Sequence, residues 1–170
     1  MTIVIDGTPP SLKNHDGTSP TLLVVRLVPK ARYVKARHVS AGLRLIPDDL
    51  REKLSMYFVG IGKGHQIPIL CAGGTANHAH LLISLPACVP LAKAIQVLKA
   101  NSSRWLGEHG SDFAWQEGYG AFSVSASNRK AVRNYIEHQP EHHAKRSFED
   151  EFVSLLSKSG VGYDPKFVFG

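Results

Sequence analysis

Short apolar runs, each bounded by glycine, proline or polar residues, recur along the chain and predict four strands. Residues 21–28 (TLLVVRLV) are β-branched and apolar apart from one arginine, which is typical of a buried strand. Residues 66–72 (QIPILCA) and 77–85 (NHAHLLISL) have the same character, and we expect Gly73 and Gly74 between them to form a turn or bulge. The aromatic, glycine-containing stretch nearer the C-terminus predicts a final strand over about 120–124.

Between these strands the apolar residues change to helical spacing. Pro47 is followed directly by acids and then by apolar residues at that spacing, so a helix is predicted over about 47–63 with the acids at the positive end of its dipole. A second helix is predicted from Pro90 and should end at Gly107 and Gly110. Its polar face is expected to carry Lys93, Lys99, Asn101, Ser102 and Arg104.

A third helix is predicted after Ser127 or Asn128, because either side chain can cap its first turn. It should end near Gln139, since Pro140 disfavours helical geometry at the residue before it. Beyond that break, a further helix is expected over about 141–158.

The order of elements is therefore strand, helix, strand, strand, helix, strand, followed by extra helices. This split β-α-β pattern predicts an α+β fold: a ferredoxin-like or RRM-like antiparallel sheet with helices on one face and an additional C-terminal helix that bears Tyr135. Residues 1–19 are rich in glycine, proline and polar side chains and are expected to be a flexible leader. Residues 20–170 are then a single domain.

Composition narrows the class of protein. Hydrophobic residues make up 43% and charged residues 20% of the chain, as in ordinary globular proteins, and no apolar run approaches the roughly 20 residues of a membrane helix. The N-terminus lacks a basic region followed by an apolar core, so we expect a cytoplasmic protein. The two cysteines lack CxxC spacing, which argues against a disulfide framework or a thiolate zinc site.

The net charge of +6 favours a polyanionic partner. The excess is uneven, because six basic residues and no acid lie between Arg26 and Arg44. A run of like charge is usually only a solvated face, so this pattern does not by itself decide for nucleic acid.

Two short motifs carry potential chemistry. His78 and His80 are separated by one residue on a predicted strand, so both imidazoles point to the same face. Tyr135 and Gln139 are four residues apart on a predicted helix, which places them one turn apart on one side. Two imidazoles and a carboxamide oxygen can hold Mg²⁺ or Mn²⁺ with positions left open for a phosphate. A tyrosine beside such a metal can then act as a covalent nucleophile.

Each of these residues alone has a plainer explanation. A pair of alternating histidines is more often structural or incidental than a metal site, and an isolated Tyr135 would be a half-buried helix residue with one hydrogen bond. Trp105 and Trp115 are expected in the core rather than as platforms for stacked bases. The catalytic interpretation therefore depends on the co-occurrence of the two motifs.

Four segments, NHAHLLISLP, KANSSRWL, FAWQEGYGAFSVS and VRNYIEHQPEHH, resemble in content and order the single-tyrosine HUH transposases of bacterial insertion sequences. The resemblance covers about residues 22–167. It implies that His78 and His80 lie on the central strand and bind the metal together with Gln139. It also implies that Tyr135 is the residue that attacks DNA.

The resemblance further implies an enzyme that cleaves and rejoins single-stranded DNA through a 5′-phosphotyrosine intermediate, with Mg²⁺ or Mn²⁺ as the cofactor. Members of this family commonly work as homodimers, in which the tyrosine helix of one subunit completes the metal site of the other. They recognise short DNA hairpins near the ends of their elements. The basic residues expected to contact DNA are Arg26, Lys30, Arg32, Lys99, Arg104 and Arg133.

Some features depart from the family pattern, and some alternatives remain. Ala79 stands where a larger aliphatic residue is usual, and Asn77 stands where the family often has aspartate; neither change removes a ligand. A histidine-triad nucleotide hydrolase would need a histidine at position 82, which is Leu82. Relaxases and replication initiators usually come in larger chains with a third histidine or a second tyrosine. A catalytically silent module of the same fold that binds single-stranded or hairpin DNA stays open.

Overall fold

In the computed structural model, five strands form a single sheet in the order β1-β5-β2-β4-β3. The structure describes residues 2–5, 20–28 and 45–139. The strands are β1 (Thr2–Ile5), β2 (Thr21–Leu27), β3 (Ile69–Thr75), β4 (His78–Leu85) and β5 (Tyr119–Ser123). β2, β3, β4 and β5 pair antiparallel to their neighbours, and β1 pairs parallel to β5. The predicted antiparallel sheet is confirmed, with β1 added at its edge from within the segment expected as a leader.

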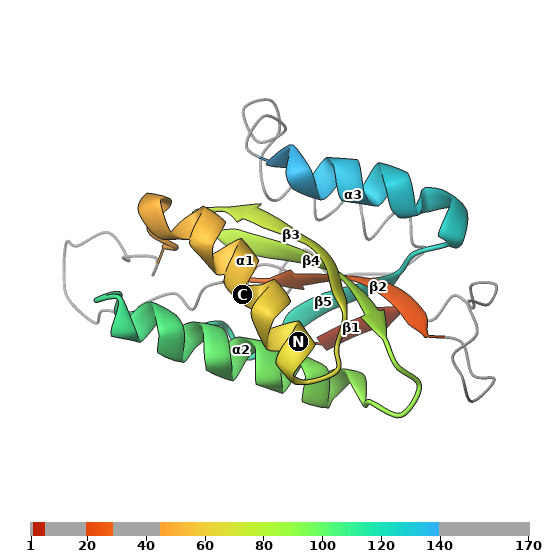
Figure 1. Ribbon diagram of the computed structural model, residues 1–170, viewed down its shortest axis with the longest axis horizontal. Helices are drawn as coiled ribbons and strands as arrows, with labels where there is room; N and C mark the ends of the chain where they lie inside the picture. The colour runs from red at the N-terminus through yellow and green to blue at the C-terminus, as the bar shows by residue number, and fades with distance from the viewer. Residues whose placement is uncertain (1, 6–19, 29–44, 140–170) are drawn as a thin grey trace, which may run out of the picture.

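The helices occupy both faces of this sheet (Figure 1). α1 (Asp48–Gly64) and α2 (Leu91–Glu108) cover one face, and α3 (Arg129–Glu137) lies on the other, after a short 3₁₀ helix at Ala126–Asn128. From β2 to β5 the order is strand, helix, strand, strand, helix, strand. The expected α+β arrangement, with two helices on one face and an additional helix that bears the tyrosine, is therefore confirmed.

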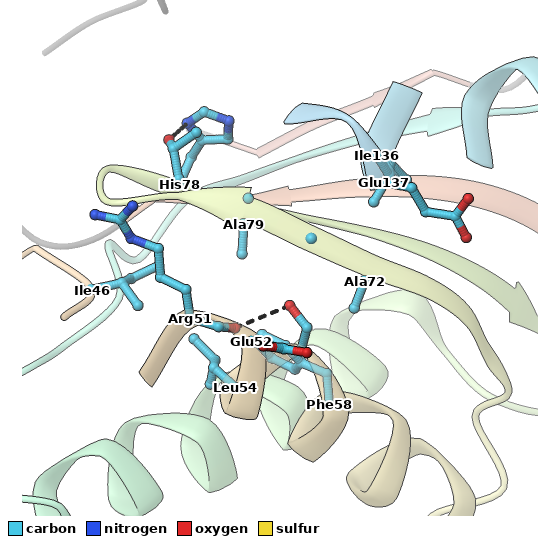
Figure 2. A pocket seen from close by; sticks show the side chains of 14 residues that line it. Ile46, Arg51, Glu52, Leu54, Phe58, Ala72, His78, Ala79, Ile136 and Glu137 are labelled. Atoms are coloured by element: carbon cyan, nitrogen blue, oxygen red, sulfur yellow. Dashed lines mark hydrogen bonds between the residues drawn. The ribbon is translucent and has the colours of Figure 1, made fainter. Parts of the chain in front are cut away.

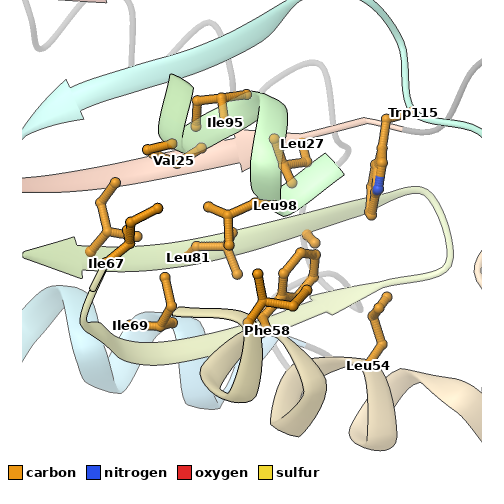
Figure 3. Packing of buried hydrophobic residues seen from close by; sticks show 14 of the residues in the cluster. Val25, Leu27, Leu54, Phe58, Ile67, Ile69, Leu81, Ile95, Leu98 and Trp115 are labelled. Carbon is orange, nitrogen blue, oxygen red and sulfur yellow. The ribbon is translucent and has the colours of Figure 1, made fainter. Parts of the chain in front are cut away.

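The main core lies between the sheet and the pair α1 and α2. Phe58 from α1 and Leu98 from α2 are almost fully buried there, against Val25 and Leu81 from the two central strands. Figure 3 shows side chains from both helices meeting those of the strands in this layer. Burying apolar side chains of this size contributes about 1.5–3 kcal/mol each, so this layer anchors the sheet that carries the histidines.

A smaller apolar layer lies between the opposite face of the sheet and α3. Ile136 of α3 is 1% exposed and packs in a cluster with Leu22, Val24, Leu82 and Phe122. These strand residues alternate along the chain with those that face the main core, as the two-residue period of a strand requires. This layer holds α3 against the sheet through Ile136, which is the residue next to Tyr135.

The connection between β3 and β4 differs from the prediction. Gly73 and Gly74 were expected to form a turn or bulge, but both pair regularly with β4 inside β3, and the turn falls at residues 76 and 77. A Cβ atom on Gly73 would lie 2.4 Å from the carbonyl oxygen of Ile136. Glycine is required here because α3 crosses this strand in direct contact with its backbone, which a single strand's sequence does not reveal.

The predicted polar face of α2 is wrong at one position. Ser102 is fully buried, and its hydroxyl accepts a hydrogen bond of 2.8 Å from the indole nitrogen of Trp115. The same hydroxyl donates to the carbonyl oxygen of Leu98 at 2.6 Å. Ser102 therefore satisfies the polar end of a buried tryptophan, which confirms Trp115 as a core residue.

The predicted helix over 141–158 and most of the expected leader lie outside the described residues. Among the residues that the structure does describe, none of the helices is long and apolar enough to cross a membrane.

Candidate active site

The two histidines of β4 lie together beneath α3. His78 is 0% and His80 1% exposed, and their ring centroids are 4.8 Å apart with the ring planes nearly perpendicular. Ala79 between them belongs to the main core on the opposite face. The alternation predicted from the sequence therefore places both imidazoles on one face of the sheet, where each is almost fully buried.

The orientation of His78 is set by the turn before it. Its Nδ1 atom lies 2.8 Å from the side-chain oxygen of Asn77 and 3.1 Å from the hydroxyl of Thr75. The Thr75 hydroxyl in turn donates to the same Asn77 oxygen at 2.7 Å. Because a carboxamide oxygen can only accept, we assign the proton of the neutral imidazole to Nδ1. The other ring nitrogen, Nε2, then presents a lone pair.

Gln139 faces that lone pair. Its side chain is 0% exposed, and its Oε1 atom lies 2.8 Å from Nε2 of His78. With the proton on Nδ1, this contact brings two acceptors together, an arrangement that a shared cation would make favourable. Within the described chain, the Nε2 atom of Gln139 is also buried without a hydrogen-bond partner. His78 and Gln139 are thus brought together as the sequence predicted.

Tyr135 lies on α3, on the same side as Gln139, and is partly buried. Its ring centroid is 5.7 Å from that of His80, at an interplanar angle of 81°. The four residues singled out from the sequence therefore meet in one place, although the two motifs are more than fifty positions apart in the chain. In the described part of the chain, no group of three or more His, Cys, Asp or Glu side chains could hold a metal ion, so a metal here would need the glutamine.

Contacts with β3 also hold α3 against the sheet. Cys71 is buried under the helix, with its Sγ atom 3.9 Å from both the carbonyl oxygen of Arg133 and Oε1 of Glu137. Desolvation and, to a smaller degree, the charge of Glu137 raise the pKa of the Cys71 thiol to about 11. The thiol therefore stays protonated at neutral pH, where it acts as a small apolar side chain.

Arg26 is the DNA-contact candidate that lies nearest the histidines. It is 2% exposed and sits directly opposite His80 in the register of β2 and β4. It follows Leu22 and Val24 at two-residue spacing on β2, and both of these face α3, so Arg26 shares the face of the histidines. A guanidinium at this depth belongs to the interior of the site rather than to an outer DNA-binding surface.

Lys99 is engaged within the protein. Its ammonium group donates to the carbonyl oxygens of Gln116, Glu117 and Gly118 at 2.7, 3.0 and 2.7 Å. All three donors of the ammonium are occupied, so its role in this structure is to hold the segment before β5 against α2.

Of the remaining DNA-contact candidates, two lie on the surface of described helices and two lie outside the described residues. Arg104 and Arg133 are exposed on α2 and α3, and Arg133 pairs with Glu137 at 2.9 Å. Lys30 and Arg32 lie outside the described residues.

Thr75 was not predicted as a site residue. It lies three residues before His78, and its hydroxyl contacts the His78 ring.

Comparison with known families identifies the protein class. A family model described as IS200-like transposase matches residues 38–139, more than half of the chain. The chain belongs to the IS200-like transposase family. The resemblance to single-tyrosine transposases noted in the sequence is therefore confirmed, and the matched segment includes both histidines, Tyr135 and Gln139.

Solved structures support the fold of this IS200-like transposase. A candidate transposase from Deinococcus radiodurans R1 is similar with a TM-score of 0.52 and 19% identity, over 75% of this chain and 98% of that chain. A REP-associated tyrosine transposase bound to a REP hairpin is similar with a TM-score of 0.50 and 12% identity, over 82% of this chain and 74% of that chain. A search of curated proteins found no match.

Proposed function

We propose that this IS200-like transposase cleaves and rejoins single-stranded DNA through a 5′-phosphotyrosine intermediate formed on Tyr135. The observation that carries the proposal is the convergence of Tyr135, His78, His80 and Gln139 in one site. Membership of the transposase family supports the reaction class. The convergence supports the assignment of these four side chains to it.

We further propose that His78, His80 and Gln139 hold Mg²⁺ or Mn²⁺. The lone pair of His78 Nε2 and the oxygen of Gln139 lie 2.8 Å apart, close to the separation of two neighbouring ligands on one small cation. Two imidazoles and a carboxamide oxygen suit Mn²⁺ in particular, as a donor set between soft and hard. When bound, the metal would polarise the scissile phosphodiester and offset its developing charge.

The side chains of the protein then carry the covalent chemistry. The Tyr135 oxygen attacks phosphorus, forms the new P–O bond and displaces the 3′-oxygen, while the phenolic proton passes through solvent and the 3′-oxygen leaves as a hydroxyl. A 3′-hydroxyl attacking the phosphotyrosine reverses the step and restores the phenol. The buried guanidinium of Arg26, opposite His80, adds positive charge on the side where the phosphate must approach.

We infer that the DNA partner is single-stranded and has hairpin ends. One structural relative is bound to a REP hairpin, and the net charge of +6 suits a nucleic acid. A homodimer remains a prediction from the sequence.

A denaturing gel tests the covalent step. The protein is incubated with single-stranded oligonucleotides from the flanks of its own gene, with and without Mn²⁺, and protein–DNA adducts are sought as bands of reduced mobility. We expect a metal-dependent adduct that Tyr135→Phe abolishes, because this change removes only the nucleophilic oxygen. DNA binding should stay nearly unchanged in that variant.

Two results would contradict the proposal. An adduct that persists in Tyr135→Phe would show that another residue is the nucleophile. Binding without any adduct, with both flanks and with either metal, would favour a catalytically silent DNA-binding module.

A further inference from the structure

A separate pocket of about 380 Å³ lies beside the candidate active site, at the edge strand β3. α1 forms one wall, and Ile136 and Glu137 at the end of α3 reach it from the other face of the sheet. Figure 2 shows the side chains of α1 and β4 arranged around it. His78 is one of the lining residues, so the pocket and the proposed metal site share a wall.

The pocket combines an apolar floor with a polar rim. The floor is formed by Ile46, Leu54, Phe58, Ala72 and Ala79. The rim carries Arg51, Glu52 and Ser55 from successive turns of α1. This composition, mostly apolar with a few convergent polar groups, is typical of sites that bind a small flat molecule.

Arg51 has donor capacity that the described residues do not use. Its terminal guanidinium nitrogen contacts Asp48 one turn earlier. Its Nε atom is buried and has no hydrogen-bond partner in the part of the chain that the structure describes. A buried N–H without an acceptor costs free energy, and an acceptor on a molecule in the pocket would remove that cost.

The chemistry of the lining favours a nucleobase over a phosphate group. The carboxylate side chain of Glu52 is part of the lining and would repel a phosphate, whereas it can accept a hydrogen bond from an exocyclic amine of a base. Arg51 can donate to a ring nitrogen or a carbonyl of the same base. The apolar floor suits the flat faces of the ring, which stack on apolar and aromatic side chains.

We propose that this pocket binds one unpaired, amine-bearing base of the DNA substrate, close to the scissile phosphate. The inference rests on the proposed function, because it takes single-stranded DNA as the ligand. A strand that runs along the face of α3 would reach the pocket around the edge of the sheet at β3, where Gly74 and Thr75 belong to the pocket lining. The pocket would then select the nucleotide beside the cleavage position.

A binding experiment without metal tests this role. Fluorescence anisotropy in EDTA measures the affinity for short oligonucleotides of three kinds: oligo-dC, oligo-dT, and an abasic strand of the same length. Arg51→Met removes the donor, and Ala72→Leu fills the pocket from a half-buried position on β3. Lys53→Met is the matched control, because it removes one charge from α1 at an exposed position that does not line the pocket.

We expect Arg51→Met and Ala72→Leu to weaken binding of oligo-dC by about tenfold, the scale of one well-made base contact. Binding of the abasic strand should change no more than it does in Lys53→Met. The wild type should also prefer oligo-dC to oligo-dT, since thymine lacks an exocyclic amine. Circular dichroism and thermal melts identify any variant that fails to fold, and the other variant then carries the test.

The outcomes separate this inference from the proposed function. Equal effects of Arg51→Met and Ala72→Leu on abasic and base-containing strands, or no effect on either, would overturn the base pocket even if wild-type protein forms the Mn²⁺-dependent adduct. A base-specific loss in these variants, with no adduct from the wild type, would support the pocket and refute the cleavage chemistry.

Discussion

If His78 binds the metal as proposed, Asn77 is the residue that orients it without itself contacting the ion. Its side-chain oxygen lies 2.8 Å from Nδ1 of His78, which leaves Nε2 available to coordinate the proposed metal. Asn77→Ala removes this acceptor, and we expect the affinity for Mn²⁺ to fall about 10–100-fold. Isothermal titration calorimetry with Mn²⁺ measures the change in the absence of DNA.

A matched control exists on α2. Asn101 donates from its side chain to the carbonyl oxygen of Val97 and lies away from the histidines, so Asn101→Ala should leave Mn²⁺ affinity unchanged. Asn77→Asp retains an acceptor and should bind Mn²⁺ at least as tightly as the wild type. An unchanged affinity in Asn77→Ala would show that His78 does not depend on this hydrogen bond.

The site residues differ in how far the sequence could predict them. His78, His80, Tyr135 and Gln139 were predictable because regular spacing fixes which side of a strand or helix each occupies. The burial of Arg26 could not be predicted, because the pattern of one strand does not show which strand pairs with it or which helix covers it. The pairing of Arg26 with His80 in the register of β2 and β4 depends on the tertiary structure. It places Arg26 beside the histidines rather than on the outer surface.

At the level of elements, α3 depends on a glycine in a different element. Gly73→Ala would place a Cβ atom 2.4 Å from the carbonyl oxygen of Ile136, and backbone cannot move aside cheaply. We expect the free energy of unfolding to fall by about 1–3 kcal/mol and the yield of covalent adduct to fall with it, because α3 carries Tyr135. Urea unfolding followed by tryptophan fluorescence measures the first effect.

Gly60→Ala is the control for this substitution. Gly60 lies within α1, and a Cβ atom there would have no neighbour within 4 Å. Alanine in a helix interior is favoured over glycine by about 0.8–1.0 kcal/mol, so this variant should be at least as stable as the wild type. A Gly73→Ala protein with unchanged stability and adduct yield would mean that α3 can shift without consequence.

The elements themselves were largely predictable, and the exceptions share a cause. α1 and α2 begin directly after Pro47 and Pro90, as the sequence indicated. Gly73 and Ser102 were misassigned because local rules read glycine as a turn and serine as a polar surface residue. Each is instead required by a partner distant in sequence, the α3 backbone in one case and the Trp115 indole in the other.

At the scale of the whole molecule, the geometry favours a site completed within one chain. The Tyr135 ring lies 5.7 Å from that of His80, and the Gln139 oxygen lies 2.8 Å from His78, all in the same polypeptide. The family resemblance had suggested that one subunit supplies its tyrosine helix to the other. The contacts of Ile136 with Gly73 and the apolar layer beneath α3 hold the helix against its own sheet.

Complementation between two inactive variants distinguishes these arrangements. Tyr135→Phe and His80→Ala are coexpressed with different tags and purified through both tags, so that only mixed assemblies remain. If each chain uses its own tyrosine, every site in the mixture carries one defect and no Mn²⁺-dependent adduct should form. If the tyrosine helices are exchanged in a two-fold dimer, about half of the sites in the mixed dimers regain both groups. We expect no adduct from a mixed dimer. If the protein is a monomer, no mixed assembly should be recovered, since each chain keeps its tyrosine beside its own histidines. An adduct at about half the wild-type yield would show instead that α3 leaves its own sheet when the subunits associate.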